Sequence, residues 1–196
     1  MAGILDVATR EFADKGLSGA RIDTIAEATQ TSKRMIYYYF GSKEGLYLAV
    51  LEDSYRKVRE TEAALQLDDL APEQALRALV EFTFDHHRRN ENYIRIVMSE
   101  NIERGAYLVR SEKIRELNLP AIAAIQRLYA RGVAADVFRP GLDPVDIHAS
   151  ISALSFFNVS NQYTFGVIYK SEYPKEEATA LRRESIVNMV LRFVRK

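Results

Sequence analysis

The sequence predicts an all-α protein, and three observations carry that prediction. Apolar residues recur at spacings of three and four along nearly every segment, as on the buried face of an amphipathic helix. Residues that begin or end helices bound most of these segments. A clear alternating strand pattern, an internal repeat and a low-complexity tract are all absent from the sequence.

Three short helices are expected in the first 45 residues. The first helix carries Ile4, Ala8 and Phe12 at helical spacing and stops at Gly16. The second covers residues 21–29 and is followed by a polar break. Ser32 is suited to be the N-cap of the third helix, which we expect over residues 33–40 with Gly41 as its stop.

Longer helices are expected in the rest of the chain. A connecting helix should run from about Lys43 to Leu65 and form the only covalent bridge between the two parts of the chain. The remaining helices are predicted over residues 72–89, 92–105, 111–134, 143–170 and 174–196, with a kink or break at Pro120. The expected domains are therefore residues 1–45 and residues 46–196.

Composition limits the class of protein without identifying it. The chain has 196 residues, of which 47% are hydrophobic, so it can bury a core without disulfides or metals. It has no cysteine, which excludes disulfides and thiolate metal sites. No apolar run approaches the ~20 residues of a membrane span, so we expect a cytoplasmic protein with no membrane partner. The 27 basic and 27 acidic residues cancel, so any case for nucleic-acid binding must rest on local charge.

The stretch IDTIAEATQTSKRMIYYYF has the form of a helix-turn-helix, in which two short helices are joined by a tight polar turn. The second helix of such a unit lies in the major groove of DNA. Ile36 and Phe40 are four residues apart and should face inwards. The outer side then carries donors for phosphates and base edges, namely Lys33, Arg34, Tyr37 and Tyr38.

The segment SGARIDTIAEATQTSKRMIYYYFGSKEGLYLAVL resembles the DNA-binding segment of the tetracycline-repressor-like (TetR) family of transcriptional regulators. The motif covers about residues 4–51. The resemblance implies an N-terminal DNA-binding domain of three helices, a connecting fourth helix, and a larger helical domain that binds a ligand and dimerises. By position it implies DNA contacts from Arg21, Ser32, Lys33, Arg34, Tyr37, Tyr38, Tyr39 and Lys43, although Tyr39 fits a packing role equally well.

Two features depart from the family pattern. Arg21 stands where members often carry a threonine that caps the second helix and contacts a phosphate. The turn sequence TQT, residues 29–31, lacks the glycine that many members use there.

The second half of the chain carries polar residues inside an apolar helix. Buried amides and hydroxyls need partners, which could be other helices, a second subunit or a bound small molecule. With aromatic and methionine side chains as walls, the candidate effector-binding residues are Phe84, Tyr93, Met98, Ser155, Asn158, Asn161 and Gln162. The alternative, that they are ordinary core and dimer-interface residues, fits each of them at least as well.

The last two long helices also carry apolar faces. The family resemblance implies a two-fold, four-helix interface there, as a helix-turn-helix protein needs in order to read two half-sites. The candidate dimer residues are Leu154, Phe157, Phe165, Ile186, Val190 and Phe193.

We therefore predict a homodimeric regulator that binds a palindromic operator in double-stranded DNA and is released by a small-molecule effector. The alternative is an all-α ligand-binding or protein-interaction module that does not bind DNA specifically. No catalytic residue, cofactor or enzyme activity is predicted, since the sequence has no glycine-rich phosphate loop and no supported catalytic triad. A metal site is not predicted either, because the adjacent His86 and His87 point about 100° apart on a helix.

Overall fold

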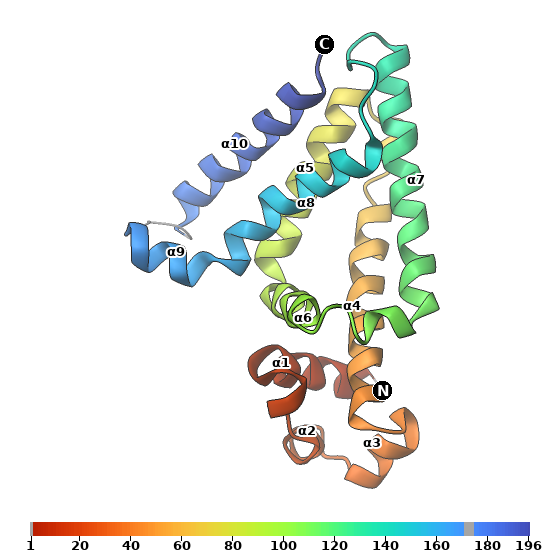
Figure 1. The fold of residues 1–196 in the computed structure, drawn as a ribbon, viewed down its shortest axis with the longest axis vertical. Helices are drawn as coiled ribbons and strands as arrows, with labels where there is room; N and C mark the ends of the chain where they lie inside the picture. Colours follow the sequence, from red (N-terminus) through yellow and green to blue (C-terminus); the bar gives the residue numbers. More distant parts are fainter. Residues whose placement is uncertain (1, 171–174) are drawn as a thin grey trace. The chain divides into compact units, whose positions relative to one another are not determined.

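The computed structural model describes residues 2–170 and 175–196, and its elements there are helices, with no strand beyond an isolated bridge between Phe138 and Arg195 (Figure 1). The all-α prediction is confirmed. None of the described helices is long and apolar enough to span a bilayer. The elements are α1 Ala2–Gly19, α2 Ile22–Ala28, α3 Lys33–Phe40, α4 Lys43–Ala63, η1 Leu67–Asp69, α5 Pro72–Arg89, α6 Glu91–Ile102, η2 Leu108–Arg110, α7 Glu112–Ala134, α8 Pro144–Ser160, α9 Gln162–Tyr169 and α10 Glu176–Val194.

The helices form two compact units, and each unit combines segments that are distant in the sequence. Unit 1 comprises Met1–Val58 and Asn90–Leu117, and unit 2 comprises Arg59–Arg89 and Asn118–Lys196. The chain therefore crosses between these units three times, and α4 carries the first of the crossings. The predicted functional boundary after residue 45 falls near the start of α4 and stays a prediction.

Unit 1 is built around a core shared by its first four helices and α6. α1 packs against α2 and α6, and α2 packs against α3. Phe12, Ile25 and Ile36 are completely buried there, and Ile96 joins them from α6. Gly16 has φ 65° and ψ 176°, which interrupts α1 where the sequence predicted its stop.

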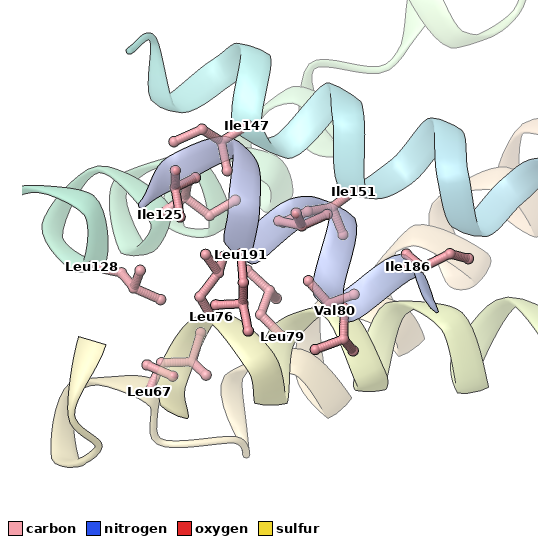
Figure 2. Packing of buried hydrophobic residues seen from close by; sticks show 14 of the residues in the cluster. Leu67, Leu76, Leu79, Val80, Ile125, Leu128, Ile147, Ile151, Ile186 and Leu191 are labelled. Carbon is pink, nitrogen blue, oxygen red and sulfur yellow. The ribbon is translucent and has the colours of Figure 1, made fainter. Parts of the chain in front are cut away.

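Unit 2 has a second core between α5, α8 and α10, which pack against one another. Figure 2 shows side chains from these helices, from α7 and from η1 meeting in one cluster. Its labelled members are Leu67, Leu76, Leu79, Val80, Ile125, Leu128, Ile147, Ile151, Ile186 and Leu191. Burial of these branched apolar side chains is the main force that holds unit 2 together.

Two of the longer predicted helices differ from the structure. The helix expected over residues 143–170 breaks at Asn161 into α8 and α9. Asn161 donates its side-chain amide to Ser160 Oγ at 2.7 Å, a local bond of the kind that competes with helix formation. α7 continues through Pro120 without a break. Residue 174, the expected start of the last helix, lies outside the described residues.

Candidate nucleic-acid interface

The turn between α2 and α3 is closed by backbone hydrogen bonds. Thr31 N donates to Ala26 O at 3.0 Å, and Gln30 N donates to Glu27 O at 3.2 Å. Gln30 has φ 51°, so a residue with a Cβ holds the left-handed conformation that a glycine adopts without strain. The missing glycine noted in the sequence therefore changes the energy of the turn and leaves its hydrogen bonding in place.

Both ends of α3 are capped as the sequence predicts. Ser32 Oγ accepts a hydrogen bond from Met35 N at 3.2 Å. At the other end Gly41 has φ 74°, and its N–H donates to Tyr37 O at 2.8 Å. These caps fix the length of α3 at eight residues, and the Ser32 hydroxyl, which accepts in the cap, can still donate its own hydrogen.

α3 presents a polar and aromatic face to solvent. Ile36 is completely buried and Phe40 is partly buried against the core of unit 1, as expected from their spacing. The three tyrosines are exposed, by 44% for Tyr37, 78% for Tyr38 and 46% for Tyr39. Their exposure argues against a purely structural role for the tyrosine run, because a phenol needed for packing is buried.

We call the exposed side chains of this helix the α3 face: Lys33, Arg34, Met35, Tyr37, Tyr38 and Tyr39. Met35 was not among the predicted DNA contacts. It is 37% exposed on a short helix whose other outward residues are polar or aromatic. Helical spacing alone predicts that Met35 is exposed, since Met35 lies off the inward stripe formed by Ile36 and Phe40.

Two cations near the α3 face already have partners. The ammonium of Lys33 forms an ion pair with Asp23 of α2, and the two side chains are 56% and 49% exposed. Lys43 Nζ donates to Ser18 O at 3.2 Å. No ion pair to Arg34 occurs among the described residues, so this guanidinium is the cation of the α3 face that needs no partner exchange to reach a phosphate or base.

Arg21 lies directly before α2 and is exposed. Its side chain makes no capping hydrogen bond, whereas its backbone N–H donates to Glu11 Oε1 at 3.0 Å. Burial acts to raise the pKa of Glu11, but the hydrogen bonds from Lys15 and from the Arg21 backbone outweigh it and hold that pKa below its ordinary value. A charged Glu11 thus anchors the start of α2 and leaves the guanidinium of Arg21 in solvent.

The junction between α3 and α4 depends on a close backbone approach. A Cβ added at Gly45 would lie 2.0 Å from the carbonyl oxygen of Phe40. Gly45 N also donates to Ser42 Oγ at 3.0 Å, which caps α4. The absence of a side chain at residue 45 therefore lets α4 begin immediately behind the C-terminus of α3.

The predicted effector residues are divided between the two units of the structure. Tyr93 and Met98 belong to unit 1, and the other five belong to unit 2. Phe84 is part of the unit 2 core, and Asn161 and Gln162 lie at the break between α8 and α9. Asn158 has protein partners, since it donates to Leu154 O and accepts from Arg182 Nε at 3.0 Å.

The predicted dimer residues divide into three groups by burial. Ile186 and Val190 are at most 1% exposed within the chain's own core, so we correct the prediction and exclude them from a subunit contact. Leu154 and Phe193 are partly buried against the same core. Phe157 and Phe165 are 44% and 40% exposed, and their rings meet edge to face at 5.7 Å.

Comparison with known proteins gives this arrangement a family. The profile of bacterial regulatory proteins of the tetR family matches residues 4–50, which span the helix-turn-helix. The profile of tetracyclin repressor-like C-terminal domains matches residues 72–190. The chain belongs to the TetR family. It is thus a DNA-binding transcriptional regulator and not an enzyme.

Individual TetR-family proteins are similar over the whole chain. The HTH-type transcriptional repressor NicS of Pseudomonas putida is 34% identical over 193 residues, which cover 98% of this chain and 91% of NicS. The crystal structure of the transcriptional regulator SCO4942 from Streptomyces coelicolor matches with a TM-score of 0.74 and 27% identity, covering 98% of this chain and 97% of that one. FadR from Bacillus subtilis, crystallised with stearoyl-CoA, shares the fold with a TM-score of 0.71 and 17% identity over 97% of each chain.

Proposed function

We propose that this TetR-family protein is a homodimeric repressor that binds a palindromic operator through the α3 face and releases it when a small molecule binds in unit 2. The exposed α3 face is the observation that carries the DNA-binding part. It combines two cations with three exposed phenols on a capped helix held by a buried core. Guanidinium and ammonium groups donate to phosphates and guanine acceptors, and a phenol donates to phosphates while its ring packs on sugars or methyl groups.

We assign the contacts by how each side chain is held. Arg34, Tyr37 and Tyr38 are proposed to reach base edges or nearby phosphates, because they are exposed on the α3 face. Lys33 is proposed to join them by leaving its ion pair with Asp23. Arg21, Ser32 and Lys43 are proposed to contact phosphates from positions around that face, and Tyr39 is proposed to contact a phosphate from the face itself. Sequence preference should therefore depend mainly on the first group, and overall affinity on the second.

A homodimer is proposed because α8, α9 and α10 expose large apolar side chains. Besides Phe157 and Phe165, Leu181 of α10 is 69% exposed and Met189 is 38% exposed. Apolar side chains gathered on one part of a surface are typical of an interface. The proposed dimer surface consists of Leu154, Phe157, Phe165, Leu181, Met189 and Phe193. Two-fold symmetry would present two α3 faces to two half-sites, which is why the operator should be palindromic.

Repression and release by a small molecule are proposed from the relatives. NicS carries the name of a repressor, and the FadR structure holds stearoyl-CoA. The ligand would enter unit 2, which includes residues 72–89 and 118–190 of the segment matched by the C-terminal family profile.

The decisive experiment is enrichment of genomic DNA fragments by the purified full-length protein, followed by titration of the enriched fragment at several salt concentrations. A specific regulator should prefer its palindromic site to random DNA by at least ~1000-fold, with affinity that falls steeply as salt rises. Light scattering should give about twice the chain mass of 22.3 kDa. Equal affinity for all fragments would favour a helical module without a specific operator, and a monomeric mass at micromolar concentration would refute the dimer.

A further inference from the structure

Unit 2 contains a group of buried and half-buried basic side chains that the proposed DNA-binding function does not use. It consists of Arg59 near the end of α4, His86 and His87 on α5, and His148 on α8. His87 is 7% exposed, and the side chain of Arg59 is 14% exposed. Burial, and then the positive charge of Arg59, lower the pKa of His86 and of His148 below the ordinary value. One guanidinium thus lies close enough to influence imidazoles on two different helices.

Arg59 Nε and Ser155 Oγ are two buried polar atoms of the same unit that have neither a hydrogen-bond nor an ion-pair partner among the described residues. Nη1 of the same guanidinium lies 2.8 Å from Glu62 Oε2. Ser155 is 1% exposed. Native proteins rarely leave buried donors unsatisfied, and such atoms call for an explanation such as a bound group.

Ser155 belongs to the packed helices that carry the histidines. His148 and Ser155 are seven residues apart on α8, which places them on one face two turns from each other. α8 packs against α5, and the ring of Phe156 lies 6.0 Å from the ring of His87. One turn earlier on α5, the ring of Phe82 lies 5.5 Å from the ring of His86. Aromatic rings therefore border the basic group.

We propose that this basic group, Arg59 with His86, His87, His148 and Ser155, binds the anionic end of the effector, a carboxylate or a phosphate ester on an otherwise aromatic or apolar molecule. The inference deepens the proposed effector control and rests on it. A guanidinium offers five N–H donors in a fork that matches two oxygens of an oxyanion. Neutral imidazoles and a serine hydroxyl each add one donor, and the rings of Phe82 and Phe156 suit the apolar part.

Glu62 is the counter-ion of Arg59, and its negative charge limits how strongly this site can bind an anion. Burial raises the pKa of Glu62, and the charge of Arg59 opposes that rise. Because Nη1 of Arg59 faces Glu62 and Nε does not have a partner, an incoming oxyanion can bind the guanidinium without displacing Glu62. The negative charge of Glu62 nevertheless repels a second anion. Removing that charge should therefore strengthen anion binding, whereas removing the charge of Arg59 should weaken it.

The position of Arg59 also provides a route to control. Arg59 lies on α4, the helix that begins with Lys43 directly after the α3 face. A ligand that draws the guanidinium towards α5 and α8 acts on that helix itself. Binding of the effector's anionic group would thus act directly on α4, the helix that follows α3 in the chain.

The test compares matched probes on the full-length protein: benzoate and phenyl phosphate as anions, benzamide and benzyl alcohol as neutral counterparts. We expect one or both anions to raise the melting temperature with increasing concentration, and the neutral probes to bind at least tenfold more weakly in calorimetric titrations. Binding by benzoate alone identifies a carboxylate site, and binding by phenyl phosphate alone identifies a phosphate site. Equal binding of anions and neutral probes, or no binding by either anion at millimolar concentration, overturns the proposal.

Variants give the second arm. Arg59→Gln should reduce anion affinity at least tenfold, and Glu62→Gln should increase it, a pair of opposite changes that a merely structural role does not produce. Should Arg59→Gln fail to fold, the matched probes on the wild-type protein still decide. If neutral molecules release operator DNA equally from the wild type and from Arg59→Gln, effector control stands and the anion site is refuted. If anions bind at Arg59 without releasing DNA, the site stands and effector control fails.

Discussion

The hydroxyl of Tyr47 in α4 donates a hydrogen bond to Glu100 Oε2 of α6 at 3.3 Å, inside unit 1. The other oxygen, Glu100 Oε1, accepts from Tyr107 N at 2.8 Å and from Leu108 N at 2.7 Å. Tyr47 is 2% exposed and Glu100 is 3% exposed. Burial, reinforced by the carboxylate of Glu100, raises the pKa of Tyr47. One buried carboxylate thus joins the start of the connecting helix to a segment more than forty residues later in the chain.

Replacing Glu100 with alanine should destabilise unit 1 more than replacing Tyr47 with phenylalanine. The first change leaves a hydroxyl and two backbone N–H groups without an acceptor, which should cost about 2–4 kcal/mol, and the second removes one hydrogen bond worth about 1 kcal/mol. Urea unfolding of both single variants and the double variant gives the coupling, expected at about 1 kcal/mol. Strict additivity of the two changes would show that the hydrogen bond contributes nothing.

Changes on the α3 face should separate specificity from general affinity. Arg34→Ala should cost about 1–3 kcal/mol of operator binding if a base contact is lost. Lys43→Ala should weaken binding to all DNA and reduce the salt slope by about one. Fluorescence anisotropy with operator and random DNA at several salt concentrations distinguishes the two effects. Unchanged operator affinity in folded Arg34→Ala, Tyr37→Ala and Tyr38→Ala variants would remove the α3 face from the interface.

Asp23→Asn provides a gain-of-affinity test on the same surface. Asp23 forms an ion pair with Lys33, and its carboxylate would also repel phosphates. Neutralising it should release Lys33 and strengthen binding to both operator and random DNA, with a steeper salt dependence. Thr24→Ala, on the exposed side of the same helix, is the control for a change that alters no charge. Weaker binding by Asp23→Asn would mean that the ion pair positions Lys33 for DNA.

Gly45→Ala should impair DNA binding without removing any contact. The added methyl group would clash with the carbonyl of Phe40 at 2.0 Å, so α3 must shift relative to α4. We expect a loss of stability of about 1–3 kcal/mol and at least tenfold weaker operator binding. Gly3→Ala is the matched control, because an added Cβ there meets nothing within 4 Å. Normal operator affinity in Gly45→Ala would show that the junction yields without moving the α3 face.

Stability should fall as the pH drops from about 6.5 towards 4, through His87. Burial, followed by the charges of His86, Arg59 and His148, lowers the pKa of His87 to about 4 in the folded protein. Below pH 6.5 His87 is protonated in the unfolded chain but stays neutral in the folded chain. The free energy of unfolding therefore falls by up to about 3 kcal/mol as the pH approaches 4. Glu62 acts in the opposite sense, since its raised pKa favours proton uptake by the folded state.

The measurement for His87 is urea unfolding of the wild type and His87→Gln between pH 7.5 and 5. The variant should lose part of the pH dependence, while the contribution of Glu62 remains in both proteins and cancels in the difference. Parallel pH profiles for the two proteins would contradict the assigned role of His87.

Local rules were sufficient for the DNA-binding helices. Ser32 begins α3 through its side-chain cap, and Gly41 ends it through its backbone freedom, and both properties follow from the residue type. Ile36 faces inwards because of helical spacing alone. The dimer surface was harder, because an apolar face does not say what covers it. Ile186 and Val190 are covered by the chain's own helices. An apolar face that packs within one subunit has the same sequence pattern as an apolar face that packs against a second subunit.

The candidate effector site depended on pairing that sequence spacing does not contain. Tyr93 was grouped with Ser155, yet they lie in different units because α6 packs against α1. Arg59 is not among the residues that the sequence predicts for this site, since a lone arginine in a polar stretch usually lies in solvent. Its burial is a consequence of tertiary packing. His86 and His87, which the sequence excludes as a metal pair, become candidates for anion binding only because Arg59 lies near them.

Unit 1 is assembled from two stretches of chain, and this has consequences for synthesis and for engineering. A ribosome that has released residues 1–58 has not yet supplied Ile96, Ile114 or Glu100, which complete the interior of the unit. The DNA-binding helices must therefore wait for more than fifty further residues before they reach their final packing. A chimaera made by exchanging the first 50 or so residues between family members would pack α6 against the α1 of another protein. For this reason α6 and the start of α7 should be exchanged together with the DNA-binding helices.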